Sequence, residues 1–341
     1  MGHLDFSDET GLVIPQHLLL IGQTKAGKSR YIVEAVKDGY ECIFVDADNS
    51  LSTIRDELKD NKEALARLHY FAPSNMEVFV VNLLNEGIFR WNETRNSVYS
   101  RANAAPTDRL AQIIPSKIPS RVILAIDSWT SLTYSILRNR AAALKVDLTE
   151  IDRYSREIYG GAGFQTTGIA QVIQSLRHHV IVLAHPASYE IKQKPKGIVG
   201  QINEKDMRIL EVKQVPISTS LPHGLTIGKY FSQIGNMYVK DPTNQRVLDF
   251  KIDANRIGGG TPGGIGDPMK EYRYSKLFGL PKVDPEEYDG WIRYLTAEEL
   301  AEETAAKAAG KPASKVIQRP QVVAGGLVTA NKPTTESATA K

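Results

Sequence analysis

The chain has 341 residues, of which 42% are hydrophobic and 24% are charged, a composition typical of a globular protein with a sizeable buried core. It contains no apolar run near the roughly 18 residues that span a bilayer and no secretion pattern at its start, so we expect a cytoplasmic protein without a membrane segment. Its one cysteine, Cys42, excludes an internal disulfide.

The net charge is +3, from 42 basic and 39 acidic residues, and it is unevenly distributed. Residues 304–341 contain six basic side chains and one acidic side chain, a net +5, which leaves residues 1–303 at −2. The segment 304–341 has no periodic apolar residues, so we predict that it is a disordered basic tail. Nucleic-acid binding by the rest of the chain therefore has to be argued from local patches of charge.

Up to residue 184, short apolar runs alternate with segments of helical character. The runs cover residues 18–21, 42–45, 68–72, 122–126 and 180–184, and the helical segments cover 29–37, 51–67, 76–86, 129–144 and 169–179. This alternation predicts an α/β fold whose mostly parallel central sheet carries helices on both faces. Residues 235–240 and 247–253 predict an antiparallel extension of the sheet, so we expect residues 1–256 to form one core.

The first predicted strand runs directly into the pattern Gly22-x-x-x-x-Gly27-Lys28-Ser29. In this strand-loop-helix context, glycines let backbone N–H groups surround phosphates, the lysine reaches the outer phosphates and the serine hydroxyl binds Mg²⁺. A flexible surface loop is the alternative, and the preceding apolar strand disfavours it. The expected nucleotide contacts are Gly22, Gln23, Thr24, Lys25, Ala26, Gly27, Lys28, Ser29 and Arg30.

The second predicted strand ends with two acids, Asp46 and Asp48. Their spacing of two residues points both side chains to one face, where one of them can polarise the water that attacks the γ-phosphate. We assign this role to Asp48, which lies further out, and a structural role to Asp46. The alternative is that these acids only cap the helix that starts at Leu51.

The strand predicted at 122–126 delivers Asp127 to its carboxyl end, as the Walker B pattern does to hold Mg²⁺ through water. The alternative is that Asp127 caps the following helix. His185 ends the next predicted strand, where it can donate a hydrogen bond to the γ-phosphate; a purely structural histidine is the alternative. No Asn-Lys-x-Asp segment follows a predicted strand, which favours ATP over GTP.

Over residues 12–255 these motifs, in this order, resemble the RecA-like P-loop ATPases. The run that ends in Asp48 is similar to the RecA segment that ends in the catalytic glutamate, and the shorter aspartate leaves the rate of hydrolysis open. Asp127-Ser128 resembles the Asp-Ser ending of the family's Walker B strand, and His185 stands where RecA has its phosphate-sensing glutamine. The run that ends in Ala184-His185 resembles phage-encoded RecA-like ATPases, including those linked to single-strand annealing, and Thr24-Lys25 resembles the phosphate loop of phage recombinases.

The resemblance implies further roles. Lys229 falls where a strand of RecA proteins carries a lysine to the neighbouring subunit's nucleotide, although a solvated strand lysine is an equal alternative. Arg55 occupies the place of a residue that stacks on adenine. The family also implies a homo-oligomer, either a filament or a ring, in which two loops of each subunit meet single-stranded DNA.

The first of these loops covers residues 144–168 and contains cations, aromatic residues and glycines, a mixture that suits backbone tracking and base stacking. The second covers residues 186–222 and is rich in lysine; a merely solvated loop is the alternative for this second segment. The expected DNA contacts are Lys145, Arg153, Arg156, Lys192, Lys194, Lys196, Lys205 and Arg208.

The rest of the chain divides by composition. We predict that residues 257–268 are a glycine-rich linker or mobile loop, because no strand leads the Gly-x-Gly-x-x-Gly pattern that they contain into a helix and Pro262 interrupts it. Residues 269–303 are rich in aromatic residues and include a capping box at Thr296-x-x-Glu299, which predicts a small docked appendage of helical and aromatic character.

Together these features predict a magnesium-dependent ATPase that acts on single-stranded DNA in phage-type recombination, annealing or repair. For a phage protein the expected location is the host cytoplasm, with phage or host replication and recombination proteins as further partners. The alternatives are a RecA-fold ATPase switch or motor that acts on a protein, and a helicase or packaging motor.

Overall fold

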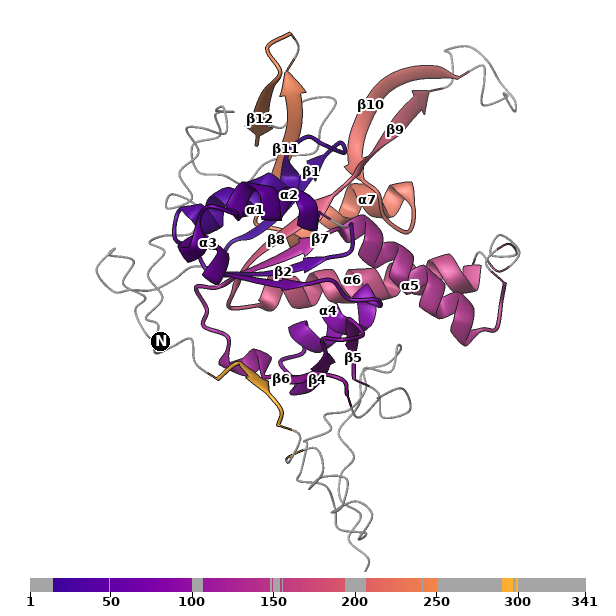
Figure 1. The fold of residues 1–341 in the computed structure, drawn as a ribbon. Coiled ribbons are helices and arrows are strands. Elements are labelled where there is room, and N and C mark those ends of the chain that lie inside the picture. The colour runs from indigo at the N-terminus through magenta and orange to yellow at the C-terminus, as the bar shows by residue number, and fades with distance from the viewer. Residues whose placement is uncertain are drawn as a thin grey trace, which may run out of the picture.

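A computed structural model describes residues 15–48, 50–99, 107–147, 149, 154, 156–193, 207–240, 242–250, 290–296 and 299. The fold is α/β, with a seven-stranded central sheet in the order β12-β11-β1-β8-β7-β2-β3 (Figure 1). The strands are β1 (His17–Gly22), β2 (Cys42–Asp46), β3 (Leu68–Phe71), β7 (Ile123–Asp127), β8 (His179–Ala184), β11 (Gln233–Lys240) and β12 (Gln245–Asp249). Every neighbouring pair is parallel except β11 and β12.

The five predicted strands up to residue 184 are therefore confirmed, but the predicted antiparallel extension is only half right. β11 joins the sheet parallel to β1, and only β12 runs antiparallel. The reason is the connection: a long excursion separates β8 from β11, which lets the chain return to the amino end of the sheet, whereas residues 241–244 leave room only for a tight turn.

Two hydrophobic clusters fill the layers on the two sides of the sheet. Leu18 and Leu20 of β1 pack in the cluster with the helices α1 (Lys28–Lys37), α2 (Leu51–Leu58) and α3 (Lys62–Ala66). Leu19 and Ile21 pack in the other cluster, with α4 (Met76–Leu84), α5 (Trp129–Ala143) and α6 (Gly161–Ser175). Because alternate side chains of a strand point to opposite faces, the apolar run 18–21 of β1 supplies both layers.

Residues 51–67 form two helices where the sequence predicts one. The Asn61 side chain accepts a hydrogen bond from the backbone N–H of Ala64 at 2.9 Å and so begins α3. Asparagine is a strong N-cap because its side chain satisfies an amide that has no partner within the helix.

The prediction of a DNA-contacting loop over residues 144–168 is wrong for its second half, which is helical. A π-helical turn, η5 (Arg156–Gly160), leads directly into α6, which begins at Gly161. A Cβ atom on Gly161 would collide with the guanidinium of Arg140 from α5. The glycines that suggested a flexible loop thus include one that allows a close approach to an α5 side chain.

The second predicted DNA loop is an antiparallel ribbon of β9 (Pro186–Gln193) and β10 (Arg208–Pro216), which projects away from the sheet (Figure 1). After it come α7 (Leu221–Ile227) and a 3-10 turn, η7 (Gly228–Tyr230). The expected strand around Lys229 is therefore wrong. Ser220 caps α7 by accepting a hydrogen bond from the N–H of His223 at 3.2 Å, and Pro222 is compatible with the first turn of a helix.

A second sheet, which the sequence analysis did not predict, has the order β13-β6-β4-β5. Its strands are β4 (Phe89–Asn92), β5 (Ser97–Val98), β6 (Leu110–Ile113) and β13 (Ile292–Tyr294), and a 3-10 turn, η3 (Pro115–Lys117), follows β6. Beside β13, Trp291 is buried edge-on against His69, with ring centroids 4.9 Å apart. The described part of residues 269–303 thus packs onto the core.

The capping box predicted after this strand is confirmed. The N–H of Thr296 donates to Glu299 Oε2 at 2.9 Å, and the N–H of Glu299 donates to Thr296 Oγ1 at 3.2 Å. The predicted linker 257–268 and basic tail 304–341 lie outside the described residues. Among the helices of the described ranges, none is long and apolar enough to cross a membrane.

Candidate functional site

The loop between β1 and α1 has the backbone that the glycine pattern demands. Gly27 has φ 104° and precedes α1, and Lys25 also has a positive φ, 67°. A Cβ atom on Gly22 would lie 2.6 Å from the carbonyl oxygen of Met237 on the neighbouring strand β11. Glycine is therefore required at position 22 by strand packing and at position 27 by the left-handed backbone.

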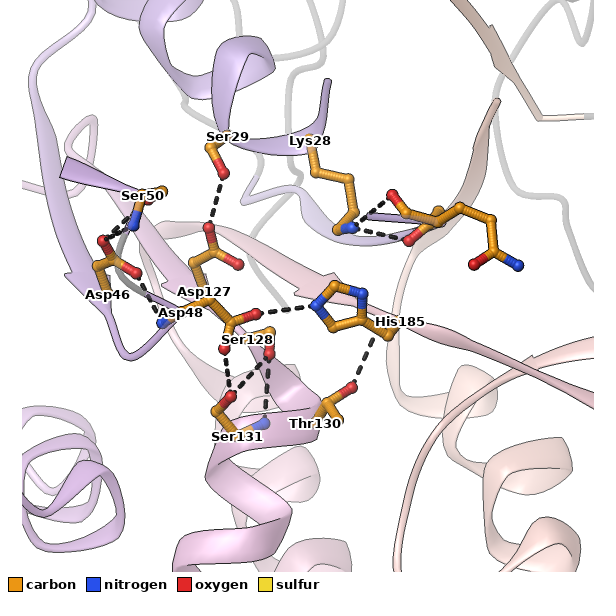
Figure 2. Close-up of polar contacts among 12 residues, drawn as sticks. Lys28, Ser29, Asp46, Asp48, Ser50, Asp127, Ser128, Thr130, Ser131 and His185 are labelled. Atoms are coloured by element: carbon orange, nitrogen blue, oxygen red, sulfur yellow. Dashed lines mark hydrogen bonds and ion pairs between the residues drawn. The ribbon is translucent and has the colours of Figure 1, made fainter. Parts of the chain in front are cut away.

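Lys28 begins α1 and folds back over the loop. Its Nζ donates to the carbonyl oxygens of Gly22 at 2.7 Å and Gln23 at 3.0 Å (Figure 2). Burial lowers the pKa of Lys28, and the nearby carboxylates of Asp127 and Asp48 counteract part of that effect. The ammonium thus lies at the mouth of the loop, held by two carbonyl groups that anionic phosphate oxygens can replace.

Asp127 and Ser29 meet at the carboxyl end of β7. The Ser29 hydroxyl donates to Asp127 Oδ2 at 2.8 Å, and Asp127 is 2% exposed. The pKa of Asp127 is raised to about 7, and burial is the largest cause. The carboxylates of Asp48 and Asp46 also raise the pKa, whereas the Ser29 hydrogen bond and the charge of Lys28 lower it. A cation bound here would relieve the repulsion among these acids.

This donor set fits Mg²⁺. A hydroxyl and a carboxylate are hard oxygen ligands, and Mg²⁺ keeps several waters and takes further oxygens from phosphates. Within the described ranges there is no group of three or more His, Cys, Asp or Glu side chains that could hold a metal. The site thus offers the two protein groups that a phosphate-bound Mg²⁺ needs, without a cage for a free ion.

Asp48 and His185, predicted to have separate roles, form one pair. Asp48 follows β2, His185 follows β8, and both strands are direct neighbours of β7. His185 Nε2 lies 2.9 Å from Asp48 Oδ2, and Ser131 donates to Asp48 Oδ1 (Figure 2). Burial of Asp48 raises its pKa, but the hydrogen bonds from Ser131, His185 and Ser128 outweigh it and hold the pKa below its usual value.

Asp46 has the structural role that the sequence indicates. Its buried carboxylate accepts hydrogen bonds from the N–H groups of Asp48 at 2.8 Å and Ser50 at 2.7 Å. It also accepts from the hydroxyls of Ser50 at 2.8 Å and Tyr70 at 2.7 Å. Asp46 therefore fixes the turn that carries Asp48 and leads into α2, which makes Asp46, and not Asp48, the acid that holds the start of this helix.

The structure brings Lys28, Ser29, Asp48, Asp127 and His185 together. The other expected site residues outside residues 22–29 are Arg30, Arg55 and Lys229. Arg30 lies 3.6 Å from both Glu34 and Glu57 and so already has acidic partners. Arg55 is exposed on α2. Lys229 lies before the amino end of β11, at the end of the sheet opposite the loop between β1 and α1, so within its own chain it is remote from this site.

The expected DNA contacts fall on several elements. Lys145 follows α5 with φ 56°, Arg156 is exposed in η5, and Lys192 on β9 pairs with Glu190 at 3.2 Å. Arg208 begins β10. Arg153, Lys194, Lys196 and Lys205 lie outside the described residues.

Sequence reasoning missed three side chains at the site. Ser131 holds Asp48, Thr130 Oγ1 accepts the N–H of His185 at 3.2 Å, and Arg246 of β12 packs on Gly27. A signal existed for the first two, because they lie in the first turn of the helix after Asp127 and must face the strand ends. No signal in the sequence indicated Arg246, since its position depends on the pairing of β12 with β11 and of β11 with β1.

Comparison with known proteins adds no relative from which a function could be transferred. No protein-family model matches the chain, and no curated protein matches it.

Proposed function

We propose that this chain is a magnesium-dependent ATPase of the RecA-like class that oligomerises and acts on single-stranded DNA. The observation that carries the proposal is the convergence of Lys28, Ser29, Asp127, Asp48 and His185 at one edge of the sheet. These residues come from the loop after β1 and the carboxyl ends of β2, β7 and β8, the edge at which parallel α/β sheets bind ligands.

In this proposal the triphosphate lies over the amino end of α1. Backbone N–H groups of residues 23–29 and the Lys28 ammonium would neutralise its charge. Ser29 and Asp127 would hold Mg²⁺, which polarises the phosphates and stabilises the charge that develops on them. The raised pKa of Asp127 supports this step, because binding of a cation is favoured where a carboxylate is buried beside other acids.

Asp48 is the residue that we place on the attacking water. Its carboxylate is fixed on both oxygens, by Ser131 and by His185, so it is already oriented. His185 faces the same space, and a γ-phosphate would offer its ring a competing acceptor. The Asp48–His185 pair thus provides a physical means by which the presence or loss of the γ-phosphate changes the position of His185.

The proposed link between the nucleotide site and DNA is the β9–β10 ribbon, which starts beside His185. β9 begins at the next residue, Pro186, and the N–H of Ile217, one residue after β10, donates to the His185 carbonyl oxygen at 2.8 Å. Both strands of the projecting ribbon therefore meet at the residue that faces the phosphates. We propose that the ribbon carries the second DNA-contacting segment, and that Lys229 acts on a neighbouring subunit's nucleotide in a filament or ring.

The test is phosphate release from MgATP with and without a single-stranded oligonucleotide. We expect turnover that DNA stimulates, and a loss of about 100-fold or more in Lys28→Ala. Lys37→Ala, at the other end of the same helix, should behave as wild type. Unchanged turnover in Lys28→Ala would refute the phosphate site, and turnover that DNA leaves unchanged would favour a protein partner.

A further inference from the structure

The hairpin of β11 and β12 extends beyond the sheet on the side of the phosphate loop. Gly22, the last residue of β1, pairs with Met237, whereas β11 continues to Lys240. Residues 238–240 and their partners on β12 therefore lie past the end of β1, where the loop begins, and Figure 1 shows the hairpin rising beyond that strand.

The register decides which side chains of this hairpin face the loop. Met237 pairs with Leu248, and both belong to the hydrophobic cluster that contains α1. Val239 pairs with Arg246, two residues further along each strand, so Arg246 points to the same face. Lys240 is one residue out of phase with Val239 and points to the opposite face.

Arg246 accordingly lies directly on the phosphate loop. A Cβ atom on Gly27 would be 2.6 Å from Cδ and 3.0 Å from Nε of Arg246. Unlike Arg30, which has two acidic partners, Arg246 has neither a hydrogen bond nor an ion pair with any residue that the structure describes. A guanidinium that has no acidic partner in the described part of the chain thus lies beside the amino end of α1, where the helix dipole also attracts anions.

We infer that Arg246 binds a phosphate group of the nucleotide held by residues 22–29, an inference that rests on the proposed function. A guanidinium presents a planar set of donors that matches phosphate oxygens, and it remains charged at every physiological pH. Lys28 and Arg246 come from different elements of the chain, α1 and β12. The nucleotide would then bridge the phosphate loop and the edge hairpin of the sheet.

The experiment is calorimetric titration of the full chain with MgATP and, separately, with magnesium tripolyphosphate, which has no base or sugar. Arg246→Met retains the aliphatic stem that packs on Gly27 but removes the charge. We expect it to weaken binding of both ligands by about 10- to 100-fold, the effect of losing a charged hydrogen bond. Arg246→Lys should recover part of the affinity, and Lys240→Ala, an equal loss of charge on the opposite face, should bind as wild type.

Three outcomes would overturn the inference. Wild-type affinity of Arg246→Met for both ligands would show that Arg246 does not touch the nucleotide. A loss confined to MgATP would show that Arg246 contacts the base or sugar. A wild-type protein that binds neither ligand would overturn the proposed function as well, whereas the first two outcomes leave it intact. Thermal unfolding of each ligand-free variant shows whether the fold is retained, and Arg246→Lys tests the assignment if Arg246→Met is unfolded.

Discussion

Asp48 shows how much of this site depends on single hydrogen bonds. One carboxylate oxygen faces His185 at 2.9 Å and the other accepts from Ser131, so the side chain has one orientation over the loop. The same bonds hold its pKa below the usual value, which makes Asp48 a weak base. Precise orientation of Asp48 favours the attack of water on the γ-phosphate, whereas its low basicity slows that step. We therefore predict slow but measurable hydrolysis.

At this scale we predict that Asp48→Asn lowers the rate of ATP hydrolysis by about 100- to 10,000-fold, the usual contribution of a positioned base. The amide retains oxygen and nitrogen atoms for hydrogen bonds, so affinity for MgATP should change only a few-fold. Single-turnover hydrolysis and calorimetric binding separate the two effects. Asp56→Asn, an exposed residue on α2, is the matched control; hydrolysis at the wild-type rate in Asp48→Asn would remove Asp48 from the mechanism.

At the scale of elements, the β9–β10 ribbon is not held to the central sheet by strand pairing. It forms a separate two-stranded sheet, and its base is fixed by the bond from Ile217 to His185 and by contacts with α7. Its register shifts between Ile209 and Glu211, and Ile209 is 49% exposed. A long ribbon with free edges and an exposed apolar residue suits contact with a further molecule.

We predict that replacing Lys192, Lys194 and Lys196 together by alanine weakens binding of single-stranded DNA and flattens its dependence on salt. Each lost phosphate contact should reduce the slope of log affinity against log salt by about 0.7. Filter binding over a range of salt concentrations measures this slope. The control is a triple replacement of Lys37, Lys59 and Lys62 on α1 to α3, which removes the same charge; equal effects from both triples would show that the ribbon has no special role.

In the whole molecule, a set of buried histidines lies at the end of the central sheet opposite the charged site. His17 Nε2 lies 3.2 Å from the Leu176 carbonyl oxygen, and His178 Nε2 lies 3.0 Å from that of Ile118. Burial lowers the pKa of both histidines. Folding therefore keeps them neutral at a pH where the unfolded chain protonates them, and their contribution to stability is lost as pH falls below about 6.5.

Asp127 changes the stability of the fold with pH in the opposite direction. Because its pKa is raised, the folded state gains stability as pH falls toward 7 and below. We therefore predict the difference in the free energy of unfolding between wild type and a variant at His178. His178→Gln retains a donor for Ile118 but does not titrate, so wild type should lose stability relative to it between pH 7.5 and 5.5, by at most about 1.4 kcal/mol per pH unit. Urea unfolding at several pH values measures the difference, and a constant difference would contradict the assignment.

Local patterns were sufficient to predict the parallel core and the five residues at one edge of its sheet, Lys28, Ser29, Asp48, Asp127 and His185. Apolar runs of four to six residues with helical segments between them have few alternative folds, and polar residues at the ends of parallel strands converge on one edge. The errors have equally local causes. Glycines at 160, 161 and 163 indicated a loop, whereas Gly161 lies in a helix and leaves room for the Arg140 side chain, and Asn61 divided a continuous helical pattern.

The sequence by itself determined the glycine loop of residues 22–29 and the strand ends that carry Asp48, Asp127 and His185, and therefore which side chains are available at that edge. Only the tertiary structure decided that Asp48 and His185 form a pair, that Ser131 orients Asp48, and that Arg246 lies on Gly27. The physical reason is that these contacts join segments between 83 and 219 residues apart in the chain, so they depend on strand order and register, which no local pattern of residues specifies.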